Sequence, residues 1–350
     1  MNTAQKIPVA PRPPVPAPRR RSLVTVALVT ALIGALVGAL LVSIARNRGL
    51  SAVTDADSGL FRSPHIIFRS LLPGPDQGRI AYAPASAPTA DRKLAGPRCV
   101  RVAAAAASAI CLRTGNNPVQ PYEAVRLDSG LRELSDEPLS GVPSRARVAP
   151  DGRHFATTVF VNGHNYISLG FSTETIVYDA NGRTVGNLED FTFTVNGRAD
   201  RSVDRNVWGV TFTTDSRLFF VTVAAAGRTY LARGDLEART LTALQENAEC
   251  PSLSPDQRTV VYKKRISPTA DQAWRFHALD LTTGRERALG ETRSIDDQVA
   301  WLDNQHIVYA APKVADGRTG ADIWTAPLDG GAPRLLIADA DSPTVVGDRP

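Results

Sequence analysis

Side chains that could catalyse a reaction or hold a metal ion are scattered along this sequence. None of the five histidines stands in the H-E-x-x-H spacing that places two zinc ligands and a base on one helix face. Gly170-Phe-Ser-Thr173 lacks the closing glycine of a G-x-S-x-G nucleophile turn. Calcium prefers a dense set of oxygens, which none of three aspartate pairs provides: Asp200/Asp204, Asp296/Asp297 and Asp339/Asp341. We therefore predict no catalytic residue, no metal and no cofactor.

The three cysteines, Cys99, Cys111 and Cys250, have no C-x-x-C spacing of the kind typical of metal sites. Cys99 and Cys111 flank a predicted hairpin whose turn falls near residues 105–106, so they are candidates for a cross-strand disulfide in an oxidising compartment. Cysteine is also common as a small buried hydrophobe, and three reduced thiols are the alternative. The sequence leaves both possibilities open.

The positive charge of the chain is concentrated at its N-terminus. Residues 1–48 hold seven lysines and arginines and no acidic residue. Subtracting these seven from the 40 basic residues leaves 33 against 35 acidic ones, a net charge of −2 for residues 49–350. A nucleic-acid-binding surface needs positive charge on the folded domain. The sequence therefore argues against nucleic acid as a partner.

The N-terminal residues predict a tail, a membrane anchor and a linker. Residues 1–21 are rich in proline and arginine, which favours an extended cytoplasmic tail. Residues 22–45 contain no ionisable group, and a helix of that length is about 36 Å long, enough to cross a hydrocarbon core of about 30 Å. A cleaved signal peptide has a shorter apolar core, and more positive charge precedes this segment than follows it. We expect a single-pass signal anchor in the plasma membrane with a cytoplasmic N-terminus, weak dimerisation through Gly34 and Gly38, and a linker over residues 46–63.

A short pattern recurs four times in the rest of the sequence, as a strand, a tight polar turn around an aspartate, and an apolar strand. The copies are Arg147-Val-Ala-Pro-Asp-Gly-Arg-His-Phe-Ala-Thr157, Val210-Thr-Phe-Thr-Thr-Asp-Ser-Arg-Leu-Phe-Phe220, Ser252-Leu-Ser-Pro-Asp-Gln-Arg-Thr-Val-Val-Tyr262 and Val299-Ala-Trp-Leu-Asp-Asn-Gln-His-Ile-Val-Tyr309. The aspartate accepts hydrogen bonds from nearby amides, and the next residue is pushed towards a left-handed conformation. Gly152 takes that conformation at no cost and Asn304 at little cost. We expect the turns with Ser216 and Gln257 to be weaker or differently built.

Each copy is followed by two more predicted strands, so the repeating unit is a four-stranded sheet. Residues 99–134 form a degenerate unit of four strands, but residues 65–94 supply only three. The sequence ends in a strand without a unit of its own, Ser342-Pro-Thr-Val-Val346. If it lies beside His65–Phe68, residues 64–346 form six units of about 47 residues, which is typical of propeller blades. We predict an all-β, six-bladed β-propeller closed by its terminal strand, with residues 347–350 as a tail; a solenoid or a sandwich does not explain the missing strand.

The repeat residues also carry a family resemblance. Pro150-Asp-Gly-Arg153 and Ser254-Pro-Asp-Gln-Arg258 resemble the repeat signature of TolB-type, WD40-like six-bladed propellers, over residues 65–346. The whole sequence looks like membrane-anchored TolB-like proteins of actinobacteria, including Pro143-Ser-Arg-Ala-Arg147, Val207-Trp-Gly-Val-Thr-Phe212 and Glu249-Cys-Pro-Ser-Leu-Ser254. The resemblance implies an extracytoplasmic propeller that interacts with other proteins.

In such a ring, the loops that enter the first strand of each blade converge at one mouth of the central channel. Because functional residues gather on loops held by a rigid scaffold, we predict a ligand site there. Its candidate residues are Arg145, Asn206, Trp208, Glu249 and Asp297. Two longer loops, residues 162–172 and 189–205, are expected to overhang the rim and to offer His164, Tyr166, Phe191 and Phe193 as contacts.

The leading hypothesis is a membrane-anchored scaffold that binds an envelope protein or peptide outside the cytoplasm. The alternative is a cell-envelope hydrolase or lyase acting at the channel mouth. In a third possibility, the protein is an accessory subunit recruited through its transmembrane helix.

Overall fold

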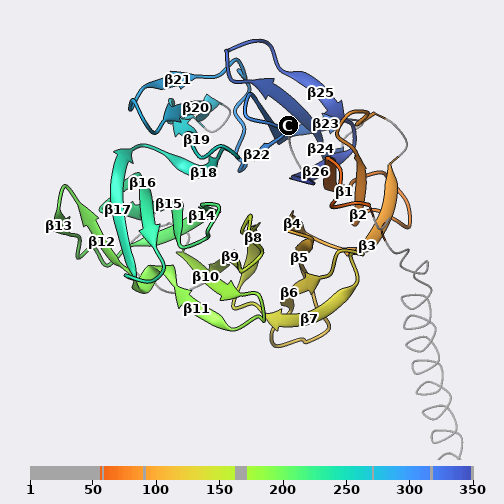
Figure 1. Ribbon diagram of the computed structural model, residues 1–350, viewed down its shortest axis with the longest axis horizontal. Coiled ribbons are helices and arrows are strands. Elements are labelled where there is room, and N and C mark those ends of the chain that lie inside the picture. Colours follow the sequence, from red (N-terminus) through yellow and green to blue (C-terminus); the bar gives the residue numbers. More distant parts are fainter. Residues whose placement is uncertain are drawn as a thin grey trace, which may run out of the picture. The chain divides into compact units, whose positions relative to one another are not determined.

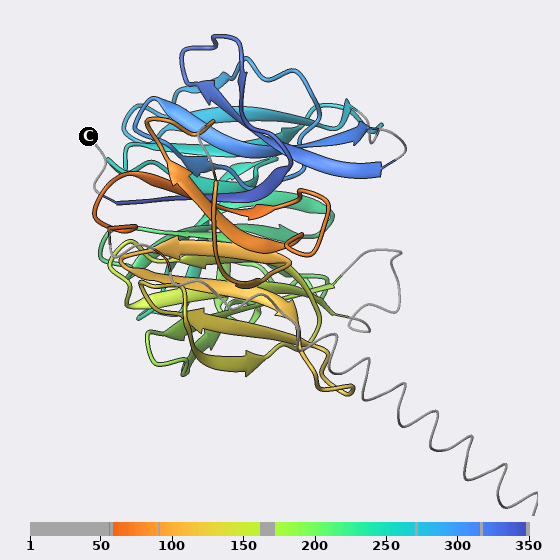
Figure 2. The same cartoon turned by 90° about the vertical axis from the view of Figure 1, so that its right-hand side faces the viewer.

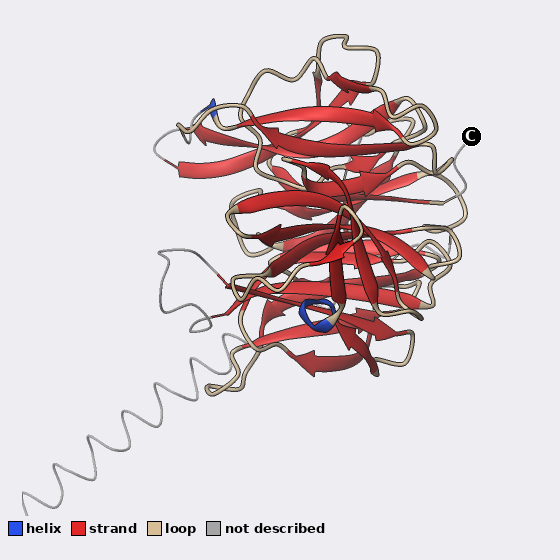
Figure 3. Cartoon of the chain, turned by 90° about the vertical axis from the view of Figure 1, so that its left-hand side faces the viewer, coloured by secondary structure: helices blue, strands red, loops and turns tan. Residues whose placement is uncertain are grey.

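The computed structural model describes residue 56 and residues 59–89, 92–161, 172–269, 272–315 and 318–347. These residues fold almost entirely into β-strands (red in Figure 3), together with the short 3-10 helix η1 (Leu188–Asp190). No helix among them is both long and apolar enough to cross a membrane. The tail, the anchor over residues 22–45 with Gly34 and Gly38, and residues 46–55, 57 and 58 of the linker lie outside the described residues.

Six sheets are arranged around a central axis as the blades of a propeller (Figure 1). From the innermost strand outward, blade 1 consists of β26 (Ala340–Val346), β1 (His65–Ser70), β2 (Arg79–Pro84) and β3 (Lys93–Arg98). Blade 2 consists of β4 (Arg101–Ala105), β5 (Ser108–Thr114), β6 (Tyr122–Leu127) and β7 (Glu133–Pro138). Blade 3 consists of β8 (Val142–Val148), β9 (His154–Val161), β10 (Ser172–Asp179) and β11 (Thr184–Asn187). Blade 4 consists of β14 (Asn206–Phe212), β15 (Leu218–Ala225), β16 (Arg228–Asp235), β17 (Thr240–Glu246), β12 (Thr192–Val195) and β13 (Arg198–Ala199). Blade 5 consists of β18 (Glu249–Leu253), β19 (Thr259–Arg265), β20 (Trp274–Asp280) and β21 (Glu286–Ala288). Blade 6 consists of β22 (Ala300–Trp301), β23 (His306–Ala315), β24 (Arg318–Pro327) and β25 (Arg334–Ile337). Figure 2 shows the ring from the side, so that its two faces, where the strands turn, lie to the left and right.

The C-terminal strand closes the ring as predicted. β26 pairs antiparallel with β1, with His65 opposite Val346 and Ile67 opposite Thr344. The hydroxyl of Thr344 also reaches blade 2, where it accepts a hydrogen bond from the Ala104 amide (3.3 Å) and donates one to the Ala104 carbonyl (3.0 Å). The terminal strand therefore completes one blade and is bonded to the next.

Apolar clusters fill the spaces between neighbouring blades. One of them joins Ile66 and Phe68 of blade 1 to Val308 and Ile323 of blade 6, all of them buried. Each blade alone would leave such a face in water, and burial of a large aliphatic or aromatic side chain contributes about 1.5–3 kcal/mol. The ring is therefore held together by contacts between sheets as well as by hydrogen bonds within them.

The polar turns between first and second strands are built alike in three blades. Gly152, Ser216 and Gln257 occupy the same place with φ angles of 70°, 53° and 60°. Their amides donate to the carbonyl three residues earlier, at 2.9, 3.0 and 2.9 Å. The expectation of a different construction at Ser216 and Gln257 is therefore wrong. Asn304, for which we expect the left-handed conformation, does not have a positive φ.

Hydrogen bonds between neighbouring turns explain why glycine is not needed at every copy. The side chain at this position reaches the turn of the preceding blade in three cases: Ser216 to Asp151 (2.7 Å), Gln257 to Thr214 (3.1 Å) and Asn304 to Asp256 (3.0 Å). A left-handed backbone costs a non-glycine residue about 1–2 kcal/mol, and one hydrogen bond offsets a similar amount. At Gly152 the neighbour is Ala106, only 3.0 Å from where a Cβ would lie. Space at this turn therefore favours glycine.

Blade 4 is wider than predicted. Within residues 189–205, β12 pairs parallel with the outer strand β17, and β13 pairs with β12, so this segment does not simply overhang the rim. Phe191 and Phe193 are fully buried in the core between blades 3 and 4 and are not available as ligand contacts. His164 and Tyr166 lie outside the described residues.

Cys99 and Cys111 are joined by a disulfide, with their Cα atoms 5.4 Å apart. Cys99 lies just before β4 and Cys111 lies in β5, so the bridge fastens the connection between blades 1 and 2 to blade 2. Cys250 is a free, buried cysteine in β18.

Candidate binding site at the propeller mouth

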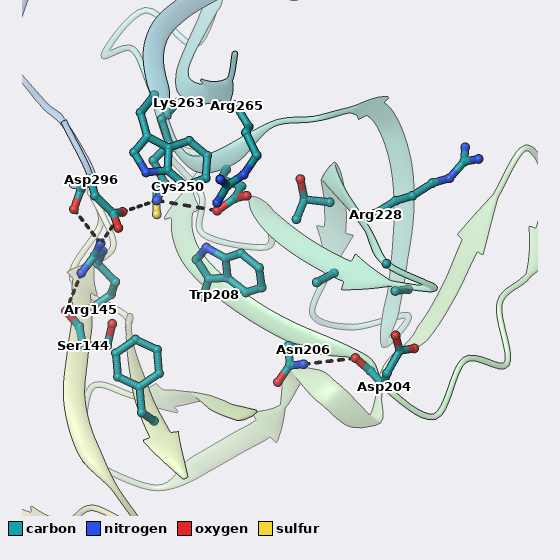
Figure 4. A pocket seen from close by; sticks show the side chains of 17 residues that line it. Ser144, Arg145, Asp204, Asn206, Trp208, Arg228, Cys250, Lys263, Arg265 and Asp296 are labelled. Atoms are coloured by element: carbon teal, nitrogen blue, oxygen red, sulfur yellow. Dashed lines mark hydrogen bonds and ion pairs between the residues drawn. The ribbon is translucent and has the colours of Figure 1, made fainter. Parts of the chain in front are cut away.

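A cavity of about 450 Å³ opens at one mouth of the propeller, over blade 4 and between blades 3 and 5 (Figure 4). Its floor comes from β8, β14 and β18, the innermost strands of these blades. Its walls come from the β15–β16 and β19–β20 hairpins and from the end of β9. The site is therefore built largely from strands and their ends, which hold side chains more rigidly than loops do.

Four of the five residues predicted from the sequence line this cavity: Arg145, Asn206, Trp208 and Glu249. The fifth, Asp297, lies deeper, beside the narrow central channel. Its carboxylate is 3.9 Å from the Arg145 guanidinium and 3.1 Å from that of Arg101. The structure thus brings all five into one region, with Asp297 as a support for the floor.

Close approach of two strands places Trp208 and Glu249 at the cavity. The register of β14 shifts between Trp208 and Thr211, and Gly209 has a φ of 73°. A Cβ at Gly209 would lie 2.9 Å from the Cα of Cys250, so only glycine fits between β14 and β18. Trp208 and Glu249, the residues just before this contact, are thereby fixed side by side on the floor.

A charge network surrounds Lys263, whose side chain is only 4% exposed. Its ammonium forms ion pairs with Asp296 and, at 3.6 Å, with Glu249. Burial alone would lower the pKa of Lys263, but Cys250 and these two carboxylates raise it above its usual value. Burial raises the pKa of Glu249, and Lys263 acts in the opposite direction. Arg145, 3.9 Å from Asp296, has its pKa raised in the same way as Lys263.

Two cations also lie over the ring of Trp274. The Lys263 ammonium is 4.0 Å and the Arg265 guanidinium 4.3 Å from the ring centroid, and Arg265 pairs with Trp274 in the β19–β20 register. Sequence reasoning missed these three residues, because it considered only the loops that enter first strands and two longer loops at the rim. The run Lys263-Lys-Arg265, which ends an apolar strand on the mouth side, was the available signal.

Asn206 lines the cavity, but its amide is already engaged. Its Oδ1 accepts a hydrogen bond from the Thr173 amide (2.7 Å), and its Nδ2 donates to the Asp204 carbonyl (3.1 Å). Nearby, the Glu189 carboxylate accepts from the Val207 amide (3.2 Å). Burial raises the pKa of Glu189 to about 7, although hydrogen bonds to its carboxylate, including the one from Val207, lower it. Asn206 and Glu189 therefore position β14 against blade 3.

Side chains cross the central channel beneath the cavity. Nε2 of Gln298 donates to the carbonyls of Pro251 (2.6 Å) and Val210 (3.1 Å). Arg147 donates to Val210 (3.4 Å) and to Val299 (3.2 Å). A second cavity, of about 390 Å³, lies on the opposite side, by the polar turns. The mouth cavity therefore has a floor and does not continue into this second cavity as an open pore.

Among the described residues, those that line the mouth cavity offer fixed charges and aromatic rings but no histidine. In the described part of the protein, no group of three or more histidine, cysteine, aspartate or glutamate side chains is placed to hold a metal ion. A preformed cavity with a few fixed polar groups is typical of a binding site.

These features define the class of the protein: a six-bladed β-propeller, closed by its C-terminal strand, with a cavity at one mouth. Its fold is similar to that of TolB from Acinetobacter baumannii, with a TM-score of 0.59 and 17% identity over 83% of this chain and 68% of that one. A protein in the nidogen/laminin complex is also similar, with a TM-score of 0.53 and 10% identity over 82% of this chain and 100% of that one. The sequence matches no protein-family model and no curated protein. At these identities the likeness to a TolB-like propeller concerns the fold.

Proposed function

We propose that this protein is an extracytoplasmic scaffold that binds a peptide or protein partner in its mouth cavity. One observation carries the proposal: aromatic and charged side chains from three neighbouring blades meet in one open cavity of about 450 Å³ and are held there by ion pairs with each other. Groups that are fixed before binding lose little freedom when a partner arrives. The cavity is thus suited to recognition by a preformed surface.

The proposal includes a single-pass anchor over residues 22–45 with the propeller outside the cytoplasm. The uncharged length of this segment supports the anchor. The Cys99–Cys111 disulfide supports the location, because disulfides persist mainly outside the cytoplasm. The test is to denature the protein with an alkylating reagent present. Only Cys250 should be alkylated before reduction, and all three cysteines should be alkylated after reduction. Three reactive thiols before reduction would contradict the location.

A second candidate, a cell-envelope hydrolase or lyase at the same mouth, is favoured by one observation. Burial raises the pKa of Glu249, and a carboxyl group with a raised pKa can act as a general acid nearer to neutral pH. Its partner Lys263, 3.6 Å away, could then stabilise developing negative charge. In this case the envelope should contain a small molecule that the protein turns over without any protein partner.

Site-specific photocrosslinking in intact envelopes tests the binding proposal. We would place a photoreactive amino acid at Phe160, on the cavity rim and 41% exposed, and as a matched control at Leu335, on the outer strand β25 and 47% exposed. A defined protein adduct should form from Phe160 only, and Trp208→Ala should reduce its yield. Equal adducts from both sites, or turnover of a small molecule without an adduct, would overturn the proposal.

A further inference from the structure

The charges on the cavity floor compensate each other. Ion pairs connect three cations with three carboxylates: Arg101, Arg145 and Lys263 with Glu249, Asp296 and Asp297. A ligand charge placed among them would have to compete with an existing partner. Selectivity for charge must therefore come from groups higher on the wall.

Arg265 is such a group. Its neighbours in β19 form close ion pairs, Lys263 on the floor and Lys264 with Glu286 at 2.8 Å. Exposed Arg265 forms no such close pair among the described residues, and its charge acts only electrostatically on Glu249, whose pKa it lowers. The guanidinium lies 4.3 Å from the Trp274 ring centroid. This charge, which Glu249 offsets only in part, is thus held in one place at the cavity wall.

The backbone of Arg265 is fixed as well. Asn247 accepts a hydrogen bond from the Arg265 amide (2.9 Å) and donates one to its carbonyl (3.0 Å). A stacked arginine keeps its planar fork of donors available for a carboxylate, and it loses less freedom on pairing than a mobile side chain does. The geometry suits recognition of a planar anion.

The other parts of the cavity wall limit what can accompany that anion. Figure 4 shows the Trp208 ring on the floor near Arg265, with Asp204 on a different side of the cavity. The Asp204 carboxylate accepts a bond from the Ala226 amide (3.2 Å). Negative charge is disfavoured at Asp204, and the aromatic surface of Trp208 favours an apolar group next to the anion.

We propose that the cavity selects peptides by a carboxylate that pairs with Arg265, next to an apolar side chain that contacts Trp208. This inference rests on the proposed function and names the ligand class for the same site. The C-terminus of a peptide and an acidic side chain present the same group, so either source satisfies the geometry. Positive or neutral peptides should bind more weakly because they bring no carboxylate to form a close pair with Arg265.

The test uses full-length protein immobilised in detergent and three pools of random heptapeptides without other acidic residues. The first pool ends in a free carboxylate, the second in an amide, and the third in an amide with one internal glutamate beside a phenylalanine. Arg265→Gln is compared with Arg228→Gln, because Arg228 also lines the cavity but already pairs with Glu246 at 3.0 Å. Recovery of each pool is measured by mass spectrometry, and the melting of each variant is checked.

Wild-type protein should recover at least one carboxylate pool on the order of tenfold better than the amide pool, which is typical of one charge-assisted contact. The pool recovered, first or third, identifies the source of the carboxylate. Arg265→Gln should abolish the preference, and Arg228→Gln should retain it. Equal recovery of all pools, or equal loss in both variants, overturns the inference and leaves peptide binding intact. Recovery of no pool by wild-type protein contradicts the inference and the proposed peptide binding together.

Discussion

Removal of the closing strand should strongly destabilise the propeller. A variant ending at Pro343 lacks residues 344–346, which pair with β1 in blade 1, and it also lacks the bonds of Thr344 to Ala104 in blade 2. A variant ending at Gly347 loses only residues 348–350 and is the matched control. Both variants keep all other blades intact, so they isolate the contribution of closure.

The magnitude follows from what the strand buries. Val345 and Val346 are 1% and 3% exposed, and loss of their burial costs about 1.5–3 kcal/mol each. The amide and carbonyl of Ala104 lose their partner, at about 1–3 kcal/mol each when they remain buried. The sum is about 5–12 kcal/mol, against a total stability of about 5–15 kcal/mol for a typical domain. Thr344→Val keeps the shape but replaces the hydroxyl by a methyl group, which leaves the same amide and carbonyl unpaired, so it should cost about 2–6 kcal/mol.

Urea unfolding of the full-length protein and its variants, followed by tryptophan fluorescence, measures these differences. The control ending at Gly347 should have the midpoint of the wild type, Thr344→Val a lower one, and the variant ending at Pro343 should be largely unfolded without urea. If the variant ending at Pro343 unfolds at the same midpoint as the control, then the terminal strand does not hold the ring together and the reasoning fails.

Three further predictions concern single side chains. Gln257→Ala should lower the free energy of unfolding in urea by about 1 kcal/mol, because the left-handed backbone stays and the hydrogen bond to Thr214 is lost. Gln257→Gly should be nearly neutral, because glycine adopts this backbone without cost. Equal losses in the two variants would contradict the idea that this hydrogen bond offsets the cost of the left-handed backbone. Gln298→Glu places a carboxylate against the Pro251 carbonyl and should lower the free energy of unfolding by on the order of 3 kcal/mol in the same assay. An unchanged urea midpoint would argue against a closed channel. Glu189 has a pKa of about 7 in the folded protein against an ordinary value of 4.5, so the folded state binds more protons between these pH values. Its contribution to the free energy of unfolding is therefore present below pH 4.5 and lost as pH rises through 7, by up to about 3 kcal/mol. Glu189→Gln should lack this slope, and parallel pH profiles of the two proteins would refute the assignment.

The closed ring could be predicted from the sequence because it depends on a count. Residues 65–94 supply three strands of a four-stranded blade, and residues 342–346 are a spare strand that can complete it. The pairing of His65 with Val346 confirms this arrangement. Alternation of apolar residues and aspartate turns are local signals. They are readable without knowledge of which sheets become neighbours.

The features that the sequence did not reveal depend on contacts between blades. The left-handed turn at Gln257 is stabilised from the neighbouring turn, and β12 exists because it finds the outer edge of β17. Phe193 is an alternate residue in a short polar segment and gives no local sign that it is buried. Such residues depend on a partner that is distant in sequence, and local propensity cannot supply it.

The candidate site was predictable in part for the same reason. Glu249 is the first residue of a first strand and Asp297 precedes another, and the position of these strands at the mouth follows from the repeat alone. Lys263 and Trp274 come from second and third strands, and they reach the cavity only because β19 and β20 extend to the mouth beside β18. A repeat identifies which ends of strands meet, but strand length decides which side chains arrive there.

Closure of the ring and the binding cavity are linked through a series of contacts. The hydroxyl of Ser342 in β26 accepts a bond from the Val102 amide and donates one to its carbonyl, both at 3.0 Å, and so fixes the start of β4. Arg101, the preceding residue, pairs with Asp297 at 3.1 Å, and Asp297 lies 3.9 Å from Arg145 on the cavity floor. Because each member of this series is held by the one before it, a ring opened between blades 1 and 2 would release Arg101 and leave the buried Asp297 without its closest cation. The strand that completes the fold therefore also sets the charge balance of the cavity floor.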